Sequence, residues 1–233
     1  MTGDLCGRYI CARYFSVSER QFECPMSADD DTIFDLAMQH NLNEIVRFHN
    51  VVRGSLSEHL REHRDDKYAR AALTNYDNYL SINTFLMIYS YFEEYLYLLW
   101  KKKAKTVKRT RSFSIKGYES VLLEFGVPLT NPSWMYMLKA TSVRHCLLHA
   151  NGRLSFMTHP PEQEIRAIVV QYPEELFIRN EDQLVIAVGF VRRFVDEVRN
   201  FRNAIAYQQQ GGDAHEINDI GSAAGAGGRT PII

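Results

Sequence analysis

Apolar side chains recur at steps of three and four residues over three long stretches, and this spacing constrains the fold more than any other feature. Such steps place side chains on one face of an α-helix. The three stripes are Phe34, Met38, Leu42, Ile45, Phe48, Val52, Leu56 and Leu60; Ile82, Phe85, Tyr89, Phe92, Leu96 and Leu99; and Ala187, Val191, Phe194, Val198, Phe201 and Ile205. The sequence therefore predicts three long helices, each with one buried face.

Residues that favour helix ends bracket these stripes and predict two further helices. The acidic run 29–31 precedes the first helix, in which Gly54 marks an expected bend, and the second is expected from Asn75 to Lys103. Ser114 is suited to cap a short helix that ends at Gly126. Asn131 and Pro132 suit the N-cap and first position of another helix. The inner positions expected for that helix are Trp134, Met137, Leu138 and Leu148.

Short β-branched runs after residue 152 predict a small β-hairpin. Ile165 to Val170 and Leu176 to Ile178 are the two runs, separated by a Tyr172-Pro173 break, and Asn180 is placed as the N-cap of the last helix. The expected fold is an all-α, up-and-down bundle of four to five helices with a hairpin inserted after the fourth.

Three segments are expected along the chain. Residues 1–28 show no clear period and are assigned to an N-terminal arm, and residues 29–207 form the helical domain. Residues 208–233, rich in Gln, Gly and Ala, are expected to be a disordered tail.

Composition narrows the class of protein. A formal charge of −1 excludes a general polyanion binder, so affinity for nucleic acid requires a local basic patch. The cysteines lack metal-like spacing and no signal peptide is evident, which favours free thiols in the cytoplasm: Cys6, Cys11, Cys24 and Cys146. Glu93 and Glu94 interrupt the most apolar stretch, which favours a buried helix over a membrane span.

The densest group of reactive side chains lies at the end of the helix that begins near residue 131. Arg144, His145 and His149 occupy its last turns, and Asn151-Gly152 is expected to stop it. At about 100° per residue, the two histidines share one face, and Arg144 points about 140° away from His149. The helix dipole at this end favours a protonated His149, which suits an acid. Simple C-terminal capping by these cations is the alternative.

The run from Val143 to Gly152 resembles the Arg-(four to six residues)-His motif of HEPN domains, which are helical nucleotide-binding domains. The long Tyr- and Phe-rich helix before the motif and the amphipathic helix after it extend the resemblance over residues 30 to 207. It implies a metal-independent endoribonuclease of a toxin–antitoxin or phage-defence system. It also implies a homodimer in which Arg144 and His149 of both chains form one site. In that family the residue after the arginine is often asparagine; here it is His145.

Each of the three motif residues has an expected role in RNA cleavage. The 2′-hydroxyl of RNA is an internal nucleophile, so cleavage to a 2′,3′-cyclic phosphate and a 5′-hydroxyl needs no metal. We expect Arg144 to stabilise the phosphorane and His149 to transfer a proton, with His145 positioning the phosphate or transferring a second proton.

Acidic and basic residues near the motif have two interpretations each. Glu93 or Glu94 is expected to face inward and orient Arg144 or a histidine, or else to be a solvated edge residue. Asn151 is a further supporting residue. The run 101–116 holds eight Lys and Arg and no acid, and it is interpreted either as an RNA-backbone track or as ordinary helix capping and solubility. The RNA-binding candidates in it are Lys101, Lys102, Lys103, Lys105, Lys108, Arg109 and Arg111.

No cofactor and no metal are expected. His59 and His63 have the four-residue spacing of a metal-binding pair, but no third ligand is evident, which favours an exposed pair on a polar helix face. Two functions remain: a dimeric endoribonuclease that acts on RNA and is restrained by an antitoxin or regulatory protein, and a non-catalytic helical module that binds RNA, a nucleotide or a protein. Neither involves a membrane.

Overall fold

The computed structural model describes residues 30–63, 66–103, 114–158 and 160–216. The chain divides into two compact units, residues 1–37 and 38–233. In the first unit the described part is the start of helix α2. Everything below concerns the second unit. The expected arm 1–28 lies outside the described residues.

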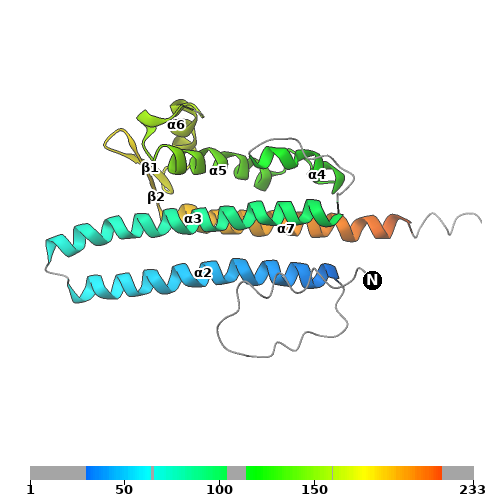
Figure 1. Cartoon of the computed structure of the whole chain (residues 1–233), viewed down its shortest axis with the longest axis horizontal. Coiled ribbons are helices and arrows are strands. Elements are labelled where there is room, and N and C mark those ends of the chain that lie inside the picture. The colour runs from blue at the N-terminus through cyan, green and yellow to red at the C-terminus, as the bar shows by residue number, and fades with distance from the viewer. Residues whose placement is uncertain (1–29, 64–65, 104–113, 159, 217–233) are drawn as a thin grey trace, which may run out of the picture. The chain divides into compact units, whose positions relative to one another are not determined.

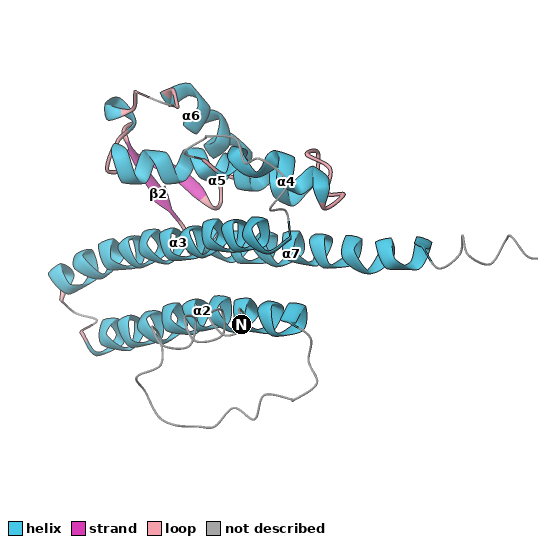
Figure 2. Cartoon of the chain, turned by 45° about the vertical axis from the view of Figure 1, so that its right-hand side comes forward, coloured by secondary structure: helices cyan, strands magenta, loops and turns pink. Residues whose placement is uncertain are grey.

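The described part of the chain holds six α-helices and one two-stranded hairpin, which confirms the expected all-α fold (Figures 1 and 2). Two 3₁₀ helices, η1 and η2, lie between them. In chain order the elements are α2 (Asp30–Glu62), α3 (Lys67–Lys103), η1 (Ile115–Tyr118), α4 (Glu119–Glu124), α5 (Pro132–His149), η2 (Leu154–Phe156), α6 (Glu162–Gln171), β1 (Leu176–Arg179), β2 (Gln183–Ile186) and α7 (Val188–Glu216).

The four longest helices alternate in direction. The Tyr91 hydroxyl donates to the Met38 carbonyl, while His49 of α2 meets Thr84 of α3, so α2 and α3 are antiparallel. Phe190 of α7 contacts Phe85 of α3. Further along both helices, Phe201 contacts Phe92, so α3 and α7 are parallel. On α5, Trp134 contacts Phe201, whereas Tyr136, which comes later in α5, contacts the earlier Phe194 of α7. Helices α5 and α7 are therefore antiparallel. The up-and-down order of the bundle is therefore as expected.

Aromatic side chains of α7 form the centre of the core. Phe85 of α3 lies edge-on to Phe194, with ring centroids 4.9 Å apart. Phe201 contacts both Phe92 of α3, at 5.4 Å, and Trp134 of α5, at 5.7 Å. All five rings are fully buried. Rings in such edge and offset contacts add about 0.5–1.5 kcal/mol per pair to the free energy of area burial.

The caps predicted for the short helices are present. The Asn131 side chain accepts a hydrogen bond from the Trp134 N–H at 3.1 Å, and Pro132 is the first residue of α5. The Ser114 hydroxyl accepts from the Lys116 N–H at the start of η1. Gly126 follows α4 with a positive φ of 69°. The cap by Asn131, followed by Pro132, fixes where α5, the helix that carries the motif, begins.

Two expectations for the region after α5 are wrong. Residues 165–170 form part of α6 and not a strand, because Ile165 and Ile168 lie three residues apart on one buried helical face. The hairpin pairs Leu176–Arg179 with Gln183–Ile186 instead. Asn180 has a φ of 51° and lies in the hairpin turn, so it does not cap α7.

Other boundaries and positions also differ from the sequence expectation. Helix α3 begins at Lys67, eight residues before Asn75, and α7 continues through Glu216, into the segment expected to be disordered. Helix α2 is one unbroken helix that includes Gly54, and the bend expected there stays a prediction. The side chains of Phe48 and Leu148 are exposed, although both were expected to face the core.

His49 replaces Phe48 on the buried face of α2. Its Nδ1 lies 2.8 Å from the Thr84 hydroxyl oxygen of α3, and its Nε2 is buried without a hydrogen-bond partner. Burial lowers the pKa of His49, and the positive charge of Arg53 lowers it further. The negative charge of Asp77 raises the pKa of His49 and the positive charge of Arg192 lowers it, and both effects are weaker than those of burial and Arg53.

None of the described helices is long and apolar enough to cross a membrane.

We predict a large loss of stability when one phenylalanine is replaced by alanine and almost none when another is replaced. Phe201→Ala removes a ring packed between α3 and α5 and should lower the free energy of unfolding by about 3–5 kcal/mol. Phe48→Ala is the matched control; since its ring is 54% exposed, the loss should stay within about 0.5 kcal/mol. Urea unfolding followed by circular dichroism measures both. Equal losses would contradict the position given for Phe48.

His49 should make stability depend on pH. Because its pKa in the folded state lies below the ordinary histidine value of 6.5, the unfolded chain binds the proton first as pH falls. The contribution of His49 is therefore complete above pH 6.5 and is lost as pH falls through its folded-state pKa. His49→Gln should flatten this part of the pH profile, as measured by urea unfolding at a series of pH values. An unchanged slope in the variant would contradict the assignment.

Candidate functional site

The last two turns of α5 carry both histidines of the motif on one face, as their spacing predicts. The rings of His145 and His149 lie 4.3 Å apart between centroids, at an angle of 41°. His149 is exposed and His145 is half-buried. The imidazole of His149 is therefore accessible to a ligand from solvent.

Arg144 is held on both sides by residues of α3. Its Nη2 donates to the Glu93 carboxylate, with Oε2 at 3.3 Å, and its guanidinium carbon lies 4.9 Å from the centre of the Tyr89 ring. The side chain of Arg144 remains 25% exposed. One bond to Glu93 leaves the guanidinium with further N–H donors for an anion.

Tyr89 and Thr141 are the site residues that the sequence did not single out. The Thr141 hydroxyl donates to the Met137 carbonyl, so the Tyr89 hydroxyl donates to Thr141, at 2.8 Å. Burial raises the pKa of Tyr89, which keeps this hydroxyl protonated. Its position four residues before Glu93 is the one signal in the sequence, because that spacing places both side chains on one face of α3.

The two neighbouring glutamates differ in environment. Glu93 is half-buried and contacts Arg144, which is the orienting role that the sequence allowed for it. Burial raises the pKa of Glu93, while the charge of Arg144 acts in the opposite direction. Glu94 is exposed, as expected for a solvated edge residue. Of the pair, only Glu93 has a described contact with the motif.

The expected stop of α5 at Asn151 and Gly152 is confirmed. These two residues have φ values of 50° and 73°, and the Gly152 N–H donates to the Cys146 carbonyl at 3.0 Å. The backbone of Asn151 turns the chain away from the helix, while its side chain is exposed. The Gly152 carbonyl then accepts from the Leu184 N–H of β2 at 2.8 Å.

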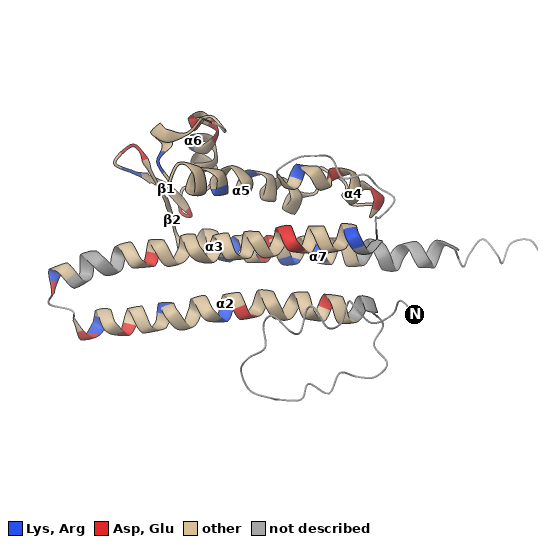
Figure 3. Cartoon of the chain, in the orientation of Figure 1, with Lys and Arg blue, Asp and Glu red and all other residues tan. Residues whose placement is uncertain are grey.

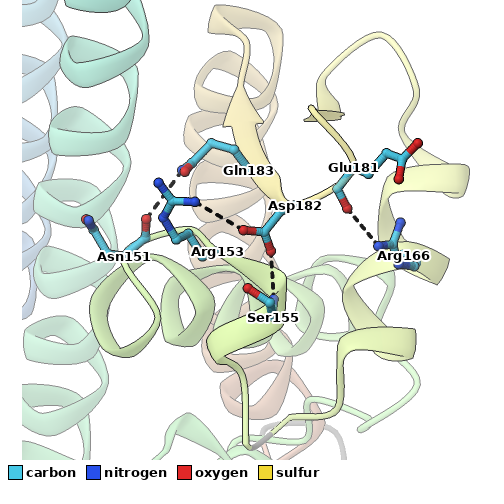
Figure 4. Close-up of polar contacts among 7 residues, drawn as sticks. All are labelled: Asn151, Arg153, Ser155, Arg166, Glu181, Asp182 and Gln183. Atoms are coloured by element: carbon cyan, nitrogen blue, oxygen red, sulfur yellow. Dashed lines mark hydrogen bonds and ion pairs between the residues drawn. The ribbon is translucent and has the colours of Figure 1, made fainter.

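The β-hairpin is attached to the end of α5 by polar contacts around Asp182 (Figure 4). The Asp182 carboxylate accepts from the Ser155 N–H at 2.8 Å and pairs with Arg153 at 3.2 Å. Several interactions lower the pKa of Asp182, and the hydrogen bond from the Ser155 N–H has the largest effect. Gln183 Nε2 donates to the Asn151 carbonyl at 3.3 Å. These contacts hold the chain directly after His149 in one conformation.

The opposite side of the motif helix lies in the core. Cys146 is a fully buried free thiol, and burial raises its pKa to about 11. Val143 and Leu147 are buried beside it. Helix α5 therefore exposes His149 while anchoring the intervening residues, which fixes the direction in which the motif side chains point.

Most of the expected RNA-binding track lies outside the described residues. Lys105, Lys108, Arg109 and Arg111 belong to this part, and of Lys102 and Lys103 only the helical backbone is described. Lys101 is exposed, eight residues beyond Glu93 on α3, or about 12 Å along the axis. Figure 3 shows acidic and basic positions interspersed along α2, whereas the described part of α3 carries few charged positions.

The described geometry combines an anchored cation with an exposed imidazole. Arg144 is oriented by a carboxylate and an aromatic ring, which suits binding of an anion such as a phosphodiester. His149, at the end of the same helix, can exchange protons with a bound group. Because Arg144 contacts α3 and His149 points to solvent at the helix end, the two side chains diverge within one chain.

Comparison with protein-family models, with curated proteins and with solved structures found no match for this chain.

Replacing Gly152 and Gly54 should change stability in opposite directions. At Gly152, φ is 73° and an added Cβ would lie 2.6 Å from Gln183 Nε2, so Gly152→Ala should destabilise by about 1–3 kcal/mol. Gly54 lies inside α2 with no heavy atom within 4 Å of such a Cβ, so Gly54→Ala should stabilise by about 0.5–1 kcal/mol. Thermal unfolding measures both variants; stabilisation by Gly152→Ala would show that the turn is not fixed as described.

Proposed function

We propose that the protein is a metal-independent endoribonuclease whose site is built on the end of α5. The observation that carries the proposal is that Arg144 is oriented by Glu93 and Tyr89 while His149 on the same helix end is open to solvent. The likeness of residues 143–152 to the HEPN motif supports the same assignment.

The proposed reaction uses the RNA as its own nucleophile. The 2′-oxygen loses its proton to a second imidazole, supplied by the paired chain, and bonds to phosphorus, and the bond from phosphorus to the 5′-oxygen breaks. His149 supplies the proton to the leaving 5′-oxygen, and Arg144 stabilises the negative charge that develops on the phosphorane oxygens. The products are a 2′,3′-cyclic phosphate and a 5′-hydroxyl end. His145, 4.3 Å from His149 between ring centroids, is proposed to position the phosphate.

The proposed active form is a homodimer. Arg144 and His149 of one chain diverge, so a single copy presents few groups to one phosphodiester. Two copies related by a twofold axis would bring two arginines and two exposed imidazoles to one cleft, which is the arrangement that the HEPN resemblance implies. An isologous interface of this kind is common for paired chains.

Further partners belong to the same proposal. The basic run from Lys101 to Arg111 is proposed to contact the RNA backbone next to the site. A toxin–antitoxin or phage-defence role in the cytoplasm, with an antitoxin or regulatory protein as partner, follows from the resemblance alone. A fall in growth rate on expression, absent with His149→Ala, would support that role.

The second candidate is a non-catalytic helical module that binds RNA, a nucleotide or a protein. One observation favours it: Arg144 already has a carboxylate partner in Glu93, as a structural arginine would. In this case the ion pair would fix α5 against α3, and His149 would contribute to binding only.

Cleavage of RNA in EDTA tests the proposal. The protein should cut total RNA and leave 2′,3′-cyclic phosphate ends, and His149→Ala should lower the rate by about 10²–10⁴-fold. Arg144→Ala should lower it by about 10²–10³-fold. Glu93→Gln, which keeps the shape and removes the charge next to Arg144, should give a smaller loss. Gel analysis and identification of the RNA ends measure these effects.

Exposed residues of α2 serve as matched controls. Arg47→Ala and His40→Ala remove an arginine and a histidine far along the sequence from the motif and should leave the rate unchanged. Intact RNA with the wild-type protein, with binding retained, would favour the module. Partial activity on mixing inactive Arg144→Ala and His149→Ala chains would support the composite dimer, and its absence would argue for a site within one chain.

A further inference from the structure

We propose that the last turn of α2 is a binding site for a divalent transition-metal ion of the zinc class, with His59, Glu62 and His63 as its three protein ligands. The site belongs to a different helix from the motif and does not depend on the nuclease proposal. It differs from the sequence expectation, which assigned the histidine pair no third ligand.

The three side chains converge because of their helical spacing. Positions i, i+3 and i+4 of a helix lie on one face. One ligand atom from each of the three residues lies within 4.8 Å of the other two. Ligands at about 2.0–2.2 Å from a tetrahedral zinc ion stand about 3.3–3.6 Å apart. All three side chains are exposed, so rotation about their χ angles can close this difference.

A hydrogen bond already fixes one ring in the form that binds metal. His63 Nδ1 lies 3.0 Å from the His59 carbonyl oxygen. Because a carbonyl oxygen only accepts, Nδ1 carries the proton in this hydrogen bond, so a neutral His63 ring would bind a metal ion through Nε2. Histidines that bind metals commonly donate their second ring N–H to a backbone carbonyl in this way. The rings of His59 and His63 lie 4.1 Å apart between centroids.

The donor set indicates the type of metal. Two neutral imidazoles and one carboxylate match zinc and its neighbours in the first transition row, whereas magnesium and calcium prefer oxygen ligands alone. Catalytic zinc ions are commonly shielded from bulk water, and here all three ligands are exposed. We therefore infer binding and not hydrolysis, with water in the remaining coordination positions.

The motif histidines provide an internal comparison. His145 and His149 have the same four-residue spacing and a similar ring separation of 4.3 Å. Among the described residues no third His, Cys, Asp or Glu joins them within ligand distance, whereas Glu62 joins His59 and His63. A metal ion should therefore occupy the end of α2 before it occupies the motif.

A bound ion would stabilise the connection between α2 and α3. Glu62 is the last residue of α2, and the His63 carbonyl accepts from the Asp66 N–H one residue before α3 begins. An ion held by residues 59, 62 and 63 would fix the last helical turn before this connection. Since it binds the folded chain, it also raises the unfolding temperature by mass action.

Zinc titration of the full untagged chain tests the proposal. Isothermal calorimetry with Zn²⁺ alone should show one ion per chain, and a concentration about 100 times Kd should raise Tm by about 5–10 °C. His59→Ala, His63→Ala and Glu62→Gln should each weaken binding by at least about tenfold. Visible absorption of Co²⁺ in the same site should show imidazole and carboxylate ligation without a thiolate charge-transfer band.

Matched variants separate this site from other ligands. His40→Ala and Glu58→Gln remove an exposed histidine and an exposed glutamate of the same helix and should leave binding unchanged. Absence of Zn²⁺ binding would overturn the proposal. Binding that survives His59→Ala, or that is lost in His145→Ala instead, would overturn it as well. Circular dichroism of each variant shows whether the helical content is preserved. RNA cleavage is not part of these measurements, so failure of the nuclease proposal leaves them unaffected.

Discussion

The aromatic face of α7 is the contact on which the rest of the fold depends. Phe194 packs against Phe85 of α3, and Phe201 packs against both Phe92 of α3 and Trp134 of α5. Helices α3 and α5, which are separated in sequence by residues 104–131, therefore share one hydrophobic layer. Since this layer fixes the spacing between them, it also brings Glu93 of α3 within 3.3 Å of Arg144 on α5.

The candidate site combines fixed and accessible groups. Arg144 is anchored by the α3 residues Glu93 and Tyr89, while Asp182 and Gln183 of the hairpin region hold the chain that follows His149. Anchoring reduces the conformational entropy that a side chain loses when it binds a phosphate. His149 itself stays exposed at the helix end. This combination of an anchored Arg144 and an exposed His149 suits the proposed dimer, in which one chain orients these side chains and a second copy closes the cleft.

Two pairs of histidines with the same helical spacing have different surroundings, and this difference separates the two proposals. His145 and His149 share the end of α5 with Arg144, which Glu93 orients, and this setting is the basis of the proposed phosphate chemistry without a metal. His59 and His63 lie next to Glu62, which completes the proposed set of metal ligands. Spacing alone makes two imidazoles adjacent; the third side chain decides which chemistry the pair can support.

Local patterns in the sequence determined the helical class, the buried stripe of α7, the caps of α5 and its stop at Asn151-Gly152, because each depends on neighbours within a few residues. The same patterns misplaced Ile165 to Val170, since a short β-branched run suits a strand or a helix equally until packing selects one. Only the tertiary structure decided that His49 and not Phe48 faces the core, and that Glu93 and not Glu94 meets Arg144. Those choices depend on how one helix is rotated against another, and side chains distant in the sequence set that rotation.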